Sequence, residues 1–495
     1  MIALLKNTFF SNPHNQTELN GYVLVSSLFI RILALIFFTA FFSLSLQIEG
    51  LAGSHGILSV ENTVNQYFSS GGTDAWWKYP MLFWFNASNE ALILTCYSGC
   101  ILSLLLFLNI LPRISLTLLL VFYLSLFYAG QRFMWFQWDT LLIESGFLAL
   151  FLNSRSKIPI FLLRWLLFRL RFLSGISKLA TLDPAWSGLM AVAYYFEVQP
   201  LPNSIAWYAH QLPESILIAA AAITLFIEIF VPFMMFLPRR YRFIAAWLTI
   251  GLQILIMLTS NHNWLNILTI ALCLFLFDDK ALKKVTPVRV QAWLLAQHPP
   301  ASLLTPLDRI SMLGLSAFIF LISSVQIYEM ITFERLEGRL GDLTRKVEAY
   351  RIVNQYHVFP TMPEKRFELL IYGSNDGQTW QQFRFKYYPD SPDKRPEAII
   401  PHHPRLDWLM WFVPYNSKFL PLFENFIQSL LKGSPEVTGL LEHNPFTEKP
   451  PKYIRVDLYQ FQLTTYEERK QSGHWWKMKY LGPFPPLPYL ENYDN

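Results

Sequence analysis

Nine apolar stretches in the first 330 residues constrain the fold of this 495-residue chain more than any other feature. They lie at residues 22–46, 92–110, 115–129, 141–152, 158–176, 216–237, 243–258, 265–277 and 312–327. A helix needs about 20 apolar residues to cross the hydrocarbon core of a bilayer. Charged residues make up only 15% of the chain, whereas soluble domains carry about 25%. The sequence therefore predicts a multispan α-helical membrane protein.

Two of these stretches, 141–152 and 265–277, are too short to cross a bilayer as straight helices. They could be broken spans, re-entrant segments or segments packed inside other helices. We therefore expect a polytopic transmembrane domain over residues 1–330 with about eight or nine spans.

Basic residues concentrate in alternate loops, and cytoplasmic loops of membrane proteins carry an excess of Lys and Arg. Arg113 and the segments 239–242 and 280–309 fall in loops that nine spans place on the same side as the N-terminus. The loops of the opposite side are poor in such charge and contain little more than Lys78 and Arg132. This pattern places the C-terminal region on the non-cytoplasmic side of the membrane.

The composition changes after about residue 330, where the long apolar runs stop. We predict an extracytoplasmic, β-rich, sandwich-like domain with inserted helices over residues 345–495. Strand character at 366–371 and 381–388 flanks Ser374-Asn375-Asp376-Gly377, and Asp-Gly between two such runs is a hairpin signal. Further elements are expected as a strand at 453–463 and as helices at 406–412 and 420–431.

Charge and motifs exclude several functions. The formal net charge of +5 is too small to indicate a nucleic-acid partner. The three cysteines, Cys96, Cys100 and Cys273, all lie in apolar stretches, so we expect neither disulfides nor a thiolate metal cluster. The chain has no HxxxH or HExxH spacing, no GxSxG elbow and no phosphate-binding loop. We therefore expect no metal and no cofactor, and neither a lipase nor an ATP-driven machine.

Three ionisable residues in or beside the apolar stretches are candidates for chemistry, because such residues are costly in a membrane. Lys178 follows a stretch that contains three arginines, and crowding by positive charge favours a neutral amine that could act as a general base. The alternative is an interfacial anchor. Asp139 and Glu144 are five residues apart and do not share a helical face. They could pair with the arginines of the next stretch and line a cavity, or form structural ion pairs.

Several long strings resemble the lipase maturation factor family and cover residues from about 45 to 485. They include Phe136-Gln137-Trp138-Asp139, Leu142-Ile143-Glu144-Ser145, Asp183-Pro184-Ala185-Trp186, Val198-Gln199-Pro200-Leu201, Asn261-His262-Asn263-Trp264, Arg405-Leu406-Asp407-Trp408, Asn444-Pro445-Phe446 and His474-Trp475-Trp476. The resemblance implies a membrane protein that helps secreted client proteins, such as lipases, to fold and assemble. No covalent chemistry is implied for that role. The implied partners are a secreted client and membrane lipids.

Absence of cysteines outside the apolar stretches fits a bacterial relative in the inner membrane with its C-terminal domain in the periplasm. A eukaryotic relative would lie in the endoplasmic reticulum membrane. We predict that Trp408, Trp411, Trp475 and Trp476 contact the client, because aromatic rings gather at protein-binding surfaces. The segment around Trp408 and Trp411 has helical apolar spacing, so it could equally be a core helix or dock on the membrane.

A weaker resemblance covers only the membrane part. Gly175-Ile176-Ser177-Lys178-Leu179, followed by Trp186, is similar to the membrane region of the vitamin K-dependent γ-carboxylase superfamily. In that enzyme a lysine in the corresponding string acts as a base. The alternative function is therefore an intramembrane enzyme that uses Lys178, with Asp139 and Glu144 beside it, on a lipid or quinone.

Overall fold

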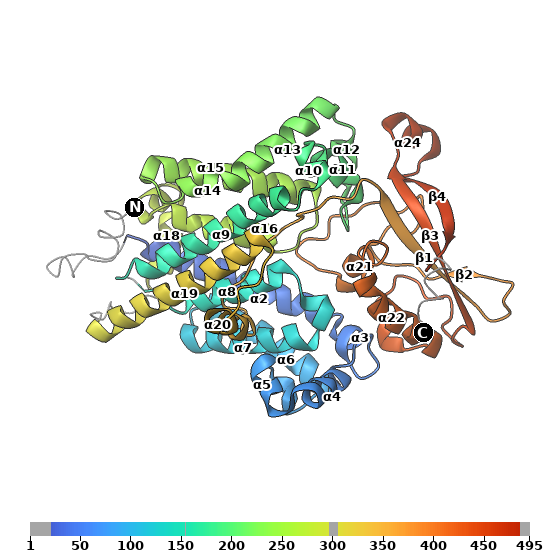
Figure 1. Ribbon diagram of the computed structural model, residues 1–495, viewed down its shortest axis with the longest axis horizontal. Coiled ribbons are helices and arrows are strands. Elements are labelled where there is room, and N and C mark those ends of the chain that lie inside the picture. Colours follow the sequence, from blue (N-terminus) through green and yellow to red (C-terminus); the bar gives the residue numbers. More distant parts are fainter. Residues whose placement is uncertain (1–20, 154, 297–304, 486–495) are drawn as a thin grey trace.

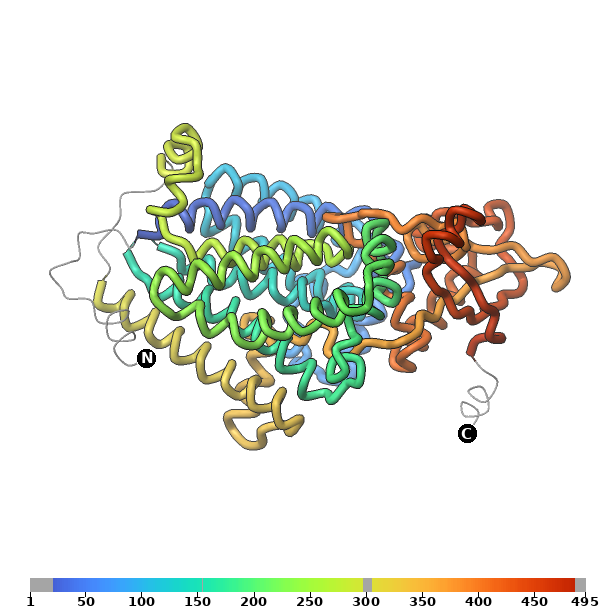
Figure 2. The backbone as a smooth tube through the Cα atoms, turned by 90° about the horizontal axis from the view of Figure 1, so that it is seen from above, coloured from blue at the N-terminus to red at the C-terminus, as the bar shows by residue number. Residues whose placement is uncertain are grey.

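The computed structural model describes residues 21–153, 155–296 and 305–485. Figure 1 shows two parts, a long bundle of helices and, at one end of it, a smaller sheet-containing region. We call residues 21–332 the helical part and residues 333–485 the C-terminal part. The tube view in Figure 2 shows the helices side by side along the long axis, with the sheet-containing region beyond one end and the start of the C-terminal part alongside the helices.

Every predicted apolar stretch forms a helix. These helices are α2 (Val23–Ser45), α6 (Asn89–Phe107), α7 (Pro112–Ala129), α8 (Gln137–Ala149), α9 (Ile158–Ala180), α13 (Glu214–Ile229) followed by α14 (Val231–Met234), α15 (Arg239–Thr259), α16 (Leu265–Cys273) and α19 (Pro306–Thr332). Five of them, α2, α6, α7, α15 and α19, are long and apolar enough to cross a membrane. The number rises to six if α12 (Ser204–His210) and α13, which meet at a bend of 113°, form one span.

The two short stretches form helices that lie inside the bundle. Helix α8 has 13 residues and α16 has 9, so they rise only about 20 Å and about 14 Å. Nearly all side chains of both are buried, and α16 packs against α2, α8, α9 and α15. They therefore match the alternative of segments packed inside other helices. The count of eight or nine spans stays a prediction.

Shorter helices connect these elements. In the helical part they are α3 (Ile48–Ala52), α4 (Val60–Gly71), α5 (Ala75–Lys78), α10 (Pro184–Ser187), α11 (Ala191–Val198), α17 (Asp279–Val285) and α18 (Val288–Ala296). The C-terminal part contains α20 (Arg339–Glu348), α21 (Arg405–Met410), α22 (Leu420–Lys432), α23 (Pro435–Thr438) and α24 (Tyr466–Ser472).

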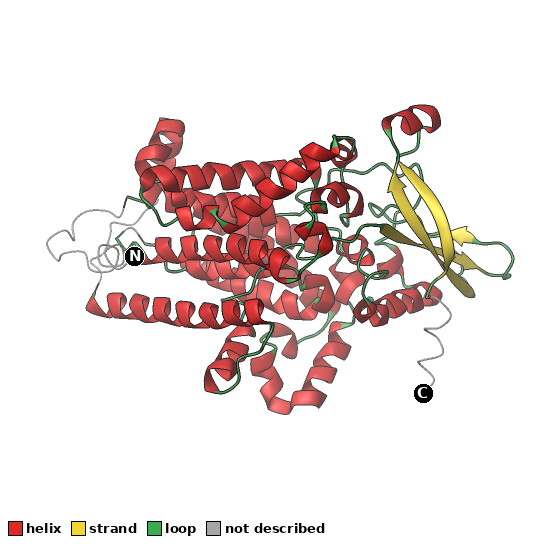
Figure 3. Ribbon diagram, turned by 45° about the horizontal axis from the view of Figure 1, so that its top comes forward, coloured by secondary structure: helices red, strands yellow, loops and turns green. Residues whose placement is uncertain are grey.

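One antiparallel sheet forms the centre of the C-terminal part, in the strand order β2-β1-β3-β4 (Figure 3). Its strands are β1 (Arg366–Ser374), β2 (Gln381–Gln382), β3 (Tyr453–Leu463) and β4 (Trp476–Pro483). Strand β1 pairs with β3 along its whole length, from Arg366 opposite Phe461 to Ser374 opposite Tyr453. The predicted strand at 453–463 is therefore confirmed.

The predicted hairpin is present, although its second strand is short. Gly377 has φ +75°, and the Asp376 carboxylate accepts hydrogen bonds from the backbone of Gln378 and Thr379 at 2.8 and 2.7 Å. The loop is therefore held by its own side chain, as Asx turns are. Gln381 and Gln382 pair with β1, and the backbone of Phe383 donates to the carbonyl of Ile371 at 2.9 Å. The chain then turns away to contact α21 and α22.

The fold class is confirmed as a helical membrane protein with a β-rich C-terminal part. The described strands form one sheet rather than a two-sheet sandwich, and helix α22 packs against one face of it through β3. Helix α22 ends at Lys432, where Gly433 adopts φ +66° as a left-handed cap. The apolar spacing of 420–431 and this glycine therefore predicted the helix correctly.

Candidate functional site

Three acidic side chains in the helical part are almost fully buried. They are Asp139 and Glu144 on α8 and Glu228 on α13, with exposed fractions of 0%, 0% and 4%. A buried carboxylate is tolerated only when cations and hydrogen-bond donors surround it. Each of the three carboxylates has such partners. Several of these partners belong to the C-terminal part, and they form the interface between the two parts.

Asp139 is bound by an arginine of the C-terminal part. The guanidinium of Arg405 on α21 contacts both carboxylate oxygens, at 3.0 and 2.8 Å, and donates to the backbone carbonyl of Phe133 at 2.6 Å. The hydroxyl of Tyr123 on α7 also donates to Asp139, at 2.5 Å. This bidentate ion pair joins residues 266 positions apart in the sequence.

The backbone beside Arg405 is bound by Ser43 near the end of helix α2 and by Gln47, which lies between α2 and α3. Gln47 donates from its amide nitrogen to the carbonyl of His403 at 2.7 Å and accepts from the backbone of Arg405 at 2.9 Å. Ser43, one turn earlier, accepts from the backbone of His403 at 2.9 Å. The segment that precedes α21 is thus held by the end of α2 and by the turn that follows it.

Glu144 is bound by α9 and by the strap, which we define as residues 350–362 after α20. Arg169 forms a buried ion pair with it, and Tyr356 donates its hydroxyl to the same carboxylate at 2.7 Å. Asn354 donates from both its backbone and its side chain, each at 3.0 Å. Glu144 therefore fixes the strap against α8 and α9.

Glu228 is bound by two cations of α9. Its carboxylate contacts Arg171 at 2.9 Å and Lys178 at 2.8 Å. The ammonium of Lys178 also donates to the carbonyls of Ser174 and Val358, at 3.0 and 2.8 Å, so all three of its hydrogens have partners. Since Val358 belongs to the strap, Lys178 joins α13, α9 and the C-terminal part.

The sheet contacts the helical part through Arg366, the first residue of β1. Arg366 on β1 forms a buried ion pair with Glu368. Its guanidinium also donates to the carbonyls of Glu197 at the end of α11 and of Gln199 and Pro200 in the loop that follows. Its guanidinium carbon lies 5.2 Å from the ring centroid of Trp476. The loop between α11 and α12 is therefore held by the first strand.

These positions test what the sequence led us to expect of the acidic residues. Glu144 pairs with the next apolar helix, as predicted, but Asp139 does not. Its partner is Arg405, because the fold brings α21 against the start of α8. Lys178 occupies a third cluster with Glu228, so the three residues named for an enzyme do not share one site. A catalytic role for Lys178 stays a prediction.

The four tryptophans predicted to contact a client are buried. Trp408, Trp411, Trp475 and Trp476 have exposed fractions of 2%, 6%, 8% and 1%. Trp408 packs edge-to-face on Trp138 of α8, with ring centroids 5.2 Å apart, and so lies between the two parts. The rings therefore have a packing role in this conformation. A client-binding role for them stays a prediction and now requires the rings to become exposed.

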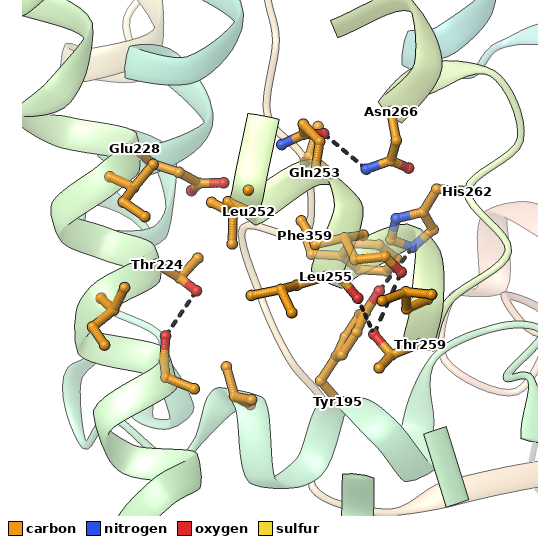
Figure 4. Close-up of a pocket in the computed structure, with 18 of the residues that line it drawn as sticks. Tyr195, Thr224, Glu228, Leu252, Gln253, Leu255, Thr259, His262, Asn266 and Phe359 are labelled. Carbon is orange, nitrogen blue, oxygen red and sulfur yellow. Dashed lines mark hydrogen bonds between the residues drawn. The ribbon is translucent and has the colours of Figure 1, made fainter. Parts of the chain in front are cut away.

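A cavity of about 710 Å³ lies between α13 and α15 (Figure 4). Most of its lining is apolar, and its charged lining residues are Arg171, Lys178 and Glu228. Asp139 and Glu144 do not line it. The cavity therefore meets only one of the three acidic clusters.

The residues that the structure describes contain no group of three or more His, Cys, Asp or Glu side chains that could hold a metal ion. All three cysteines are buried and unbonded to one another.

Two buried acids of the C-terminal part have raised pKa values. Burial raises the pKa of Glu368 to about 7, against the opposing effect of Arg366. Burial likewise raises the pKa of Asp407 to about 6, although its carboxylate accepts from the backbone of Tyr387 and Tyr388 at 2.7 and 3.1 Å. Both groups therefore bind a proton more tightly in the folded chain than in the unfolded chain.

Sequence-based reasoning missed the partners in the C-terminal part, namely Arg405, Asn354 and Tyr356. Each lies more than 200 residues from the acid it binds, and nothing local distinguishes it from a surface residue. One signal was available, because an acidic side chain in an apolar stretch, such as Asp139, requires a cation or hydrogen-bond donor, although the sequence does not show where that partner lies.

The helices, the sheet and the interface together define a class, an integral membrane protein whose C-terminal part is bound to its helices by buried ion pairs and hydrogen bonds. Comparison with known proteins gives the family. Residues 24–284 match the model of the lipase maturation factor transmembrane domain, and residues 352–486 match that of the lipase maturation factor C-terminal domain. The chain belongs to the lipase maturation factor family.

Curated relatives align over most of the chain. Lipase maturation factor 2 of Xenopus laevis is 31% identical and covers 95% of this chain and 83% of the relative. The protein of that name from Homo sapiens is 29% identical over 94% and 83%, and lipase maturation factor 1 of Mus musculus is 31% identical over 92% and 86%. No solved structure matches the chain. These relatives support a maturation-factor function and not the γ-carboxylase alternative.

The Asp139–Arg405 pair generates a stability prediction. Asp139→Asn or Arg405→Met leaves one buried charge without its partner, which costs about 3–5 kcal/mol. We expect each variant to lower the apparent melting temperature of the detergent-solubilised protein clearly. The double variant should lose much less than the sum of the two, because it leaves neither charge unpaired.

Lys477→Met serves as the control for that experiment. It removes an exposed ion pair with Glu468, in which both side chains are more than 40% exposed, and such pairs are worth at most about 1 kcal/mol. Additive effects of Asp139→Asn and Arg405→Met, or effects no larger than that of Lys477→Met, would contradict the account.

Asp407 generates a pH prediction. Its pKa is about 6 in the folded chain and about 3.9 in a model peptide, so stability falls as the pH rises between these values. Asp407→Asn keeps the acceptor oxygen and removes the titration. We expect the variant to lose less stability than the parent between about pH 4 and pH 6, by at most about 1.4 kcal/mol per pH unit. Equal slopes of melting temperature against pH in the two proteins would refute the assignment.

Proposed function

We propose that this chain is a membrane-embedded maturation factor that assists the folding and assembly of secreted client proteins, lipases among them. Membership of the lipase maturation factor family carries this proposal, and the named relatives align over more than 90% of the chain. The helical part would hold the C-terminal part at the membrane surface, where a newly translocated client emerges.

One face of the sheet supports this role, at the positions beyond Arg366 and Glu368, which lie on the same face and are buried. Cross-strand neighbours share a face, and on this face the pairs Tyr372–Arg455 and Tyr459–Tyr480 lie side by side. We define the aromatic strip as Tyr372, Trp380, Tyr453, Tyr459 and Tyr480. Tyr453 and Tyr480 are each 53% exposed, and Arg455 lies 5.1 and 4.8 Å from the ring centroids of Tyr372 and Trp380.

Such a surface suits a partly folded protein. Tyr and Arg are enriched where proteins bind one another, because they combine apolar area with hydrogen-bonding groups. The strip continues to β4, which forms an edge of the sheet, and an edge strand can pair with an extended segment of a partner. The client would therefore contact the rings of the aromatic strip and the backbone of β4. It would be released when assembly buries its own apolar surface.

We also propose an orientation. The basic segments 239–242 and 280–285 belong to the start of α15 and to α17, at the end of the helical part away from the sheet (Figure 1). Basic loops favour the cytoplasmic side, which supports a sheet on the opposite side. The sheet would face the periplasm in a bacterium or the lumen of the endoplasmic reticulum in a eukaryote.

Removal of the chain from its source cells tests the function. We expect the specific activity of a secreted lipase, measured per amount of secreted lipase polypeptide, to fall, because an unassisted lipase stays misfolded. Activity of an unrelated secreted enzyme should not change. An unchanged lipase activity would count against the proposal for that client.

The aromatic strip can be tested in the same cells. Tyr453→Ser combined with Tyr480→Ser removes two exposed rings without touching a buried one, and we expect rescue of lipase activity to fall about fivefold or more. Tyr466→Ser is the matched control, because Tyr466 on α24 is 61% exposed and lies outside the strip. Equal rescue by the double variant and the control would exclude the strip as the client surface.

Single-cysteine labelling tests the orientation. The native cysteines are buried and give little background, whereas Asn375 in the hairpin loop and Lys283 on α17 are exposed. A membrane-impermeant maleimide added to sealed cells of a bacterial host with a permeabilised outer membrane should label Asn375→Cys and not Lys283→Cys. The reverse pattern would overturn the proposed topology.

A further inference from the structure

The cavity between α13 and α15 opens sideways through apolar side chains. Ile223 on α13 and Trp247 and Leu255 on α15 line it and are 56%, 64% and 62% exposed. Helix α15 is one of the five described helices that are long and apolar enough to span a membrane, so its exposed apolar residues face lipid. A ligand would therefore enter this cavity from the bilayer rather than from water.

The opposite wall of the cavity is polar and carries net positive charge. Two cations, Arg171 and Lys178, and one anion, Glu228, are its charged lining residues among those described, which gives a formal charge of +1. Both oxygens of Glu228 are already bound by these cations. The wall therefore favours an additional anionic group.

Two hydrogen-bond donors of this wall have no partner among the residues that the structure describes. Gln253 is 1% exposed and accepts from the amide of Asn266 at 2.8 Å, but its own Nε2 donates to no described group. Figure 4 shows the Gln253 amide of α15 and the Glu228 carboxylate of α13, both turned toward the space between these two helices. Arg171 likewise has an unpartnered Nε. Buried donors without acceptors are costly, and a ligand oxygen would satisfy them.

We propose that this cavity binds a single-chain anionic lipid, a long-chain carboxylate such as a fatty acid. The acyl chain would lie between α13 and α15, and the carboxylate would accept from Gln253 beside Arg171. The volume of about 710 Å³ falls within the range of about 300–1,000 Å³ that is usual for one small ligand, which favours one chain over a diacyl lipid. This site is separate from the aromatic strip and does not depend on the proposed client role.

Gly251 offers a way to close the cavity without disturbing the fold. It lines the cavity on α15, and a Cβ added there meets no atom within 4 Å. Gly251→Leu therefore places a side chain in open space, and leucine favours a helix more than glycine does. Gly314 on α19 is the matched control, since it is also exposed, also has no atom within 4 Å of an added Cβ, and does not line the cavity.

The experiment uses the full-length protein in phosphatidylcholine nanodiscs with a photoactivatable palmitate probe that carries a diazirine on its chain. Labelled peptides are then identified by mass spectrometry. We expect labelling to concentrate on residues 214–229 and 239–259, to be lost in Gly251→Leu and to persist in Gly314→Leu. Unlabelled oleate should compete, whereas oleyl alcohol, which has no charge, should compete poorly.

Gln253→Leu tests the polar contact. We expect oleate to compete about tenfold less well in this variant, as the loss of one hydrogen bond to a charged group predicts.

Labelling spread evenly over the lipid-facing helices, or unchanged by Gly251→Leu, would overturn the site. Equal competition by oleyl alcohol would overturn its preference for an anion, and stronger competition by phosphatidylglycerol than by oleate would overturn the single chain.

Discussion

The arrangement of the whole chain depends on the burial of three carboxylates among helices. Asp139, Glu144 and Glu228 are excluded from water, and a lone buried carboxylate is too costly to persist. Arg169, Arg171 and Lys178 of α9 supply part of the compensation, but Asp139 has its ion-pair partner only in the C-terminal part. Without residues 350–411, Asp139 would have no ion-pair partner and Glu144 would lose hydrogen-bond donors.

This dependence gives the C-terminal part a fixed position at the membrane. The strap binds Glu144 and Lys178, α21 binds Asp139, and the first strand binds the loop after α11. A surface that binds partly folded clients benefits from being held in place in this way. The sheet is already ordered, so it loses little conformational entropy when a client binds. Tyr453 and Tyr480 of the aromatic strip are each 53% exposed, although the strip shares its face of the sheet with the buried Arg366 of the first strand.

The sequence predicted local elements well, because their patterns are local. Apolar runs located all nine helical stretches, alternation located β3, and Gly433 marked the end of α22. It could not predict the interface, because Asp139 and Arg405 are 266 residues apart and each looks locally like a polar residue at a helix start. Trp408 shows the same limit, since an amphipathic helix has an apolar face whether its partner is a client, a bilayer or another part of the chain.

Hydrogen–deuterium exchange of the full-length protein in detergent or nanodiscs tests the central claim most directly. The amide of Asn354 donates to Glu144 on α8 and that of Arg405 to Gln47, which follows α2. Peptides that cover 352–358 and 403–410 should therefore exchange as slowly as α8 itself. Those peptides include loop residues without regular secondary structure, so their protection would have to come from the interface. Fast exchange of both peptides beside a protected α8 would show that the C-terminal part is not held by the buried carboxylates.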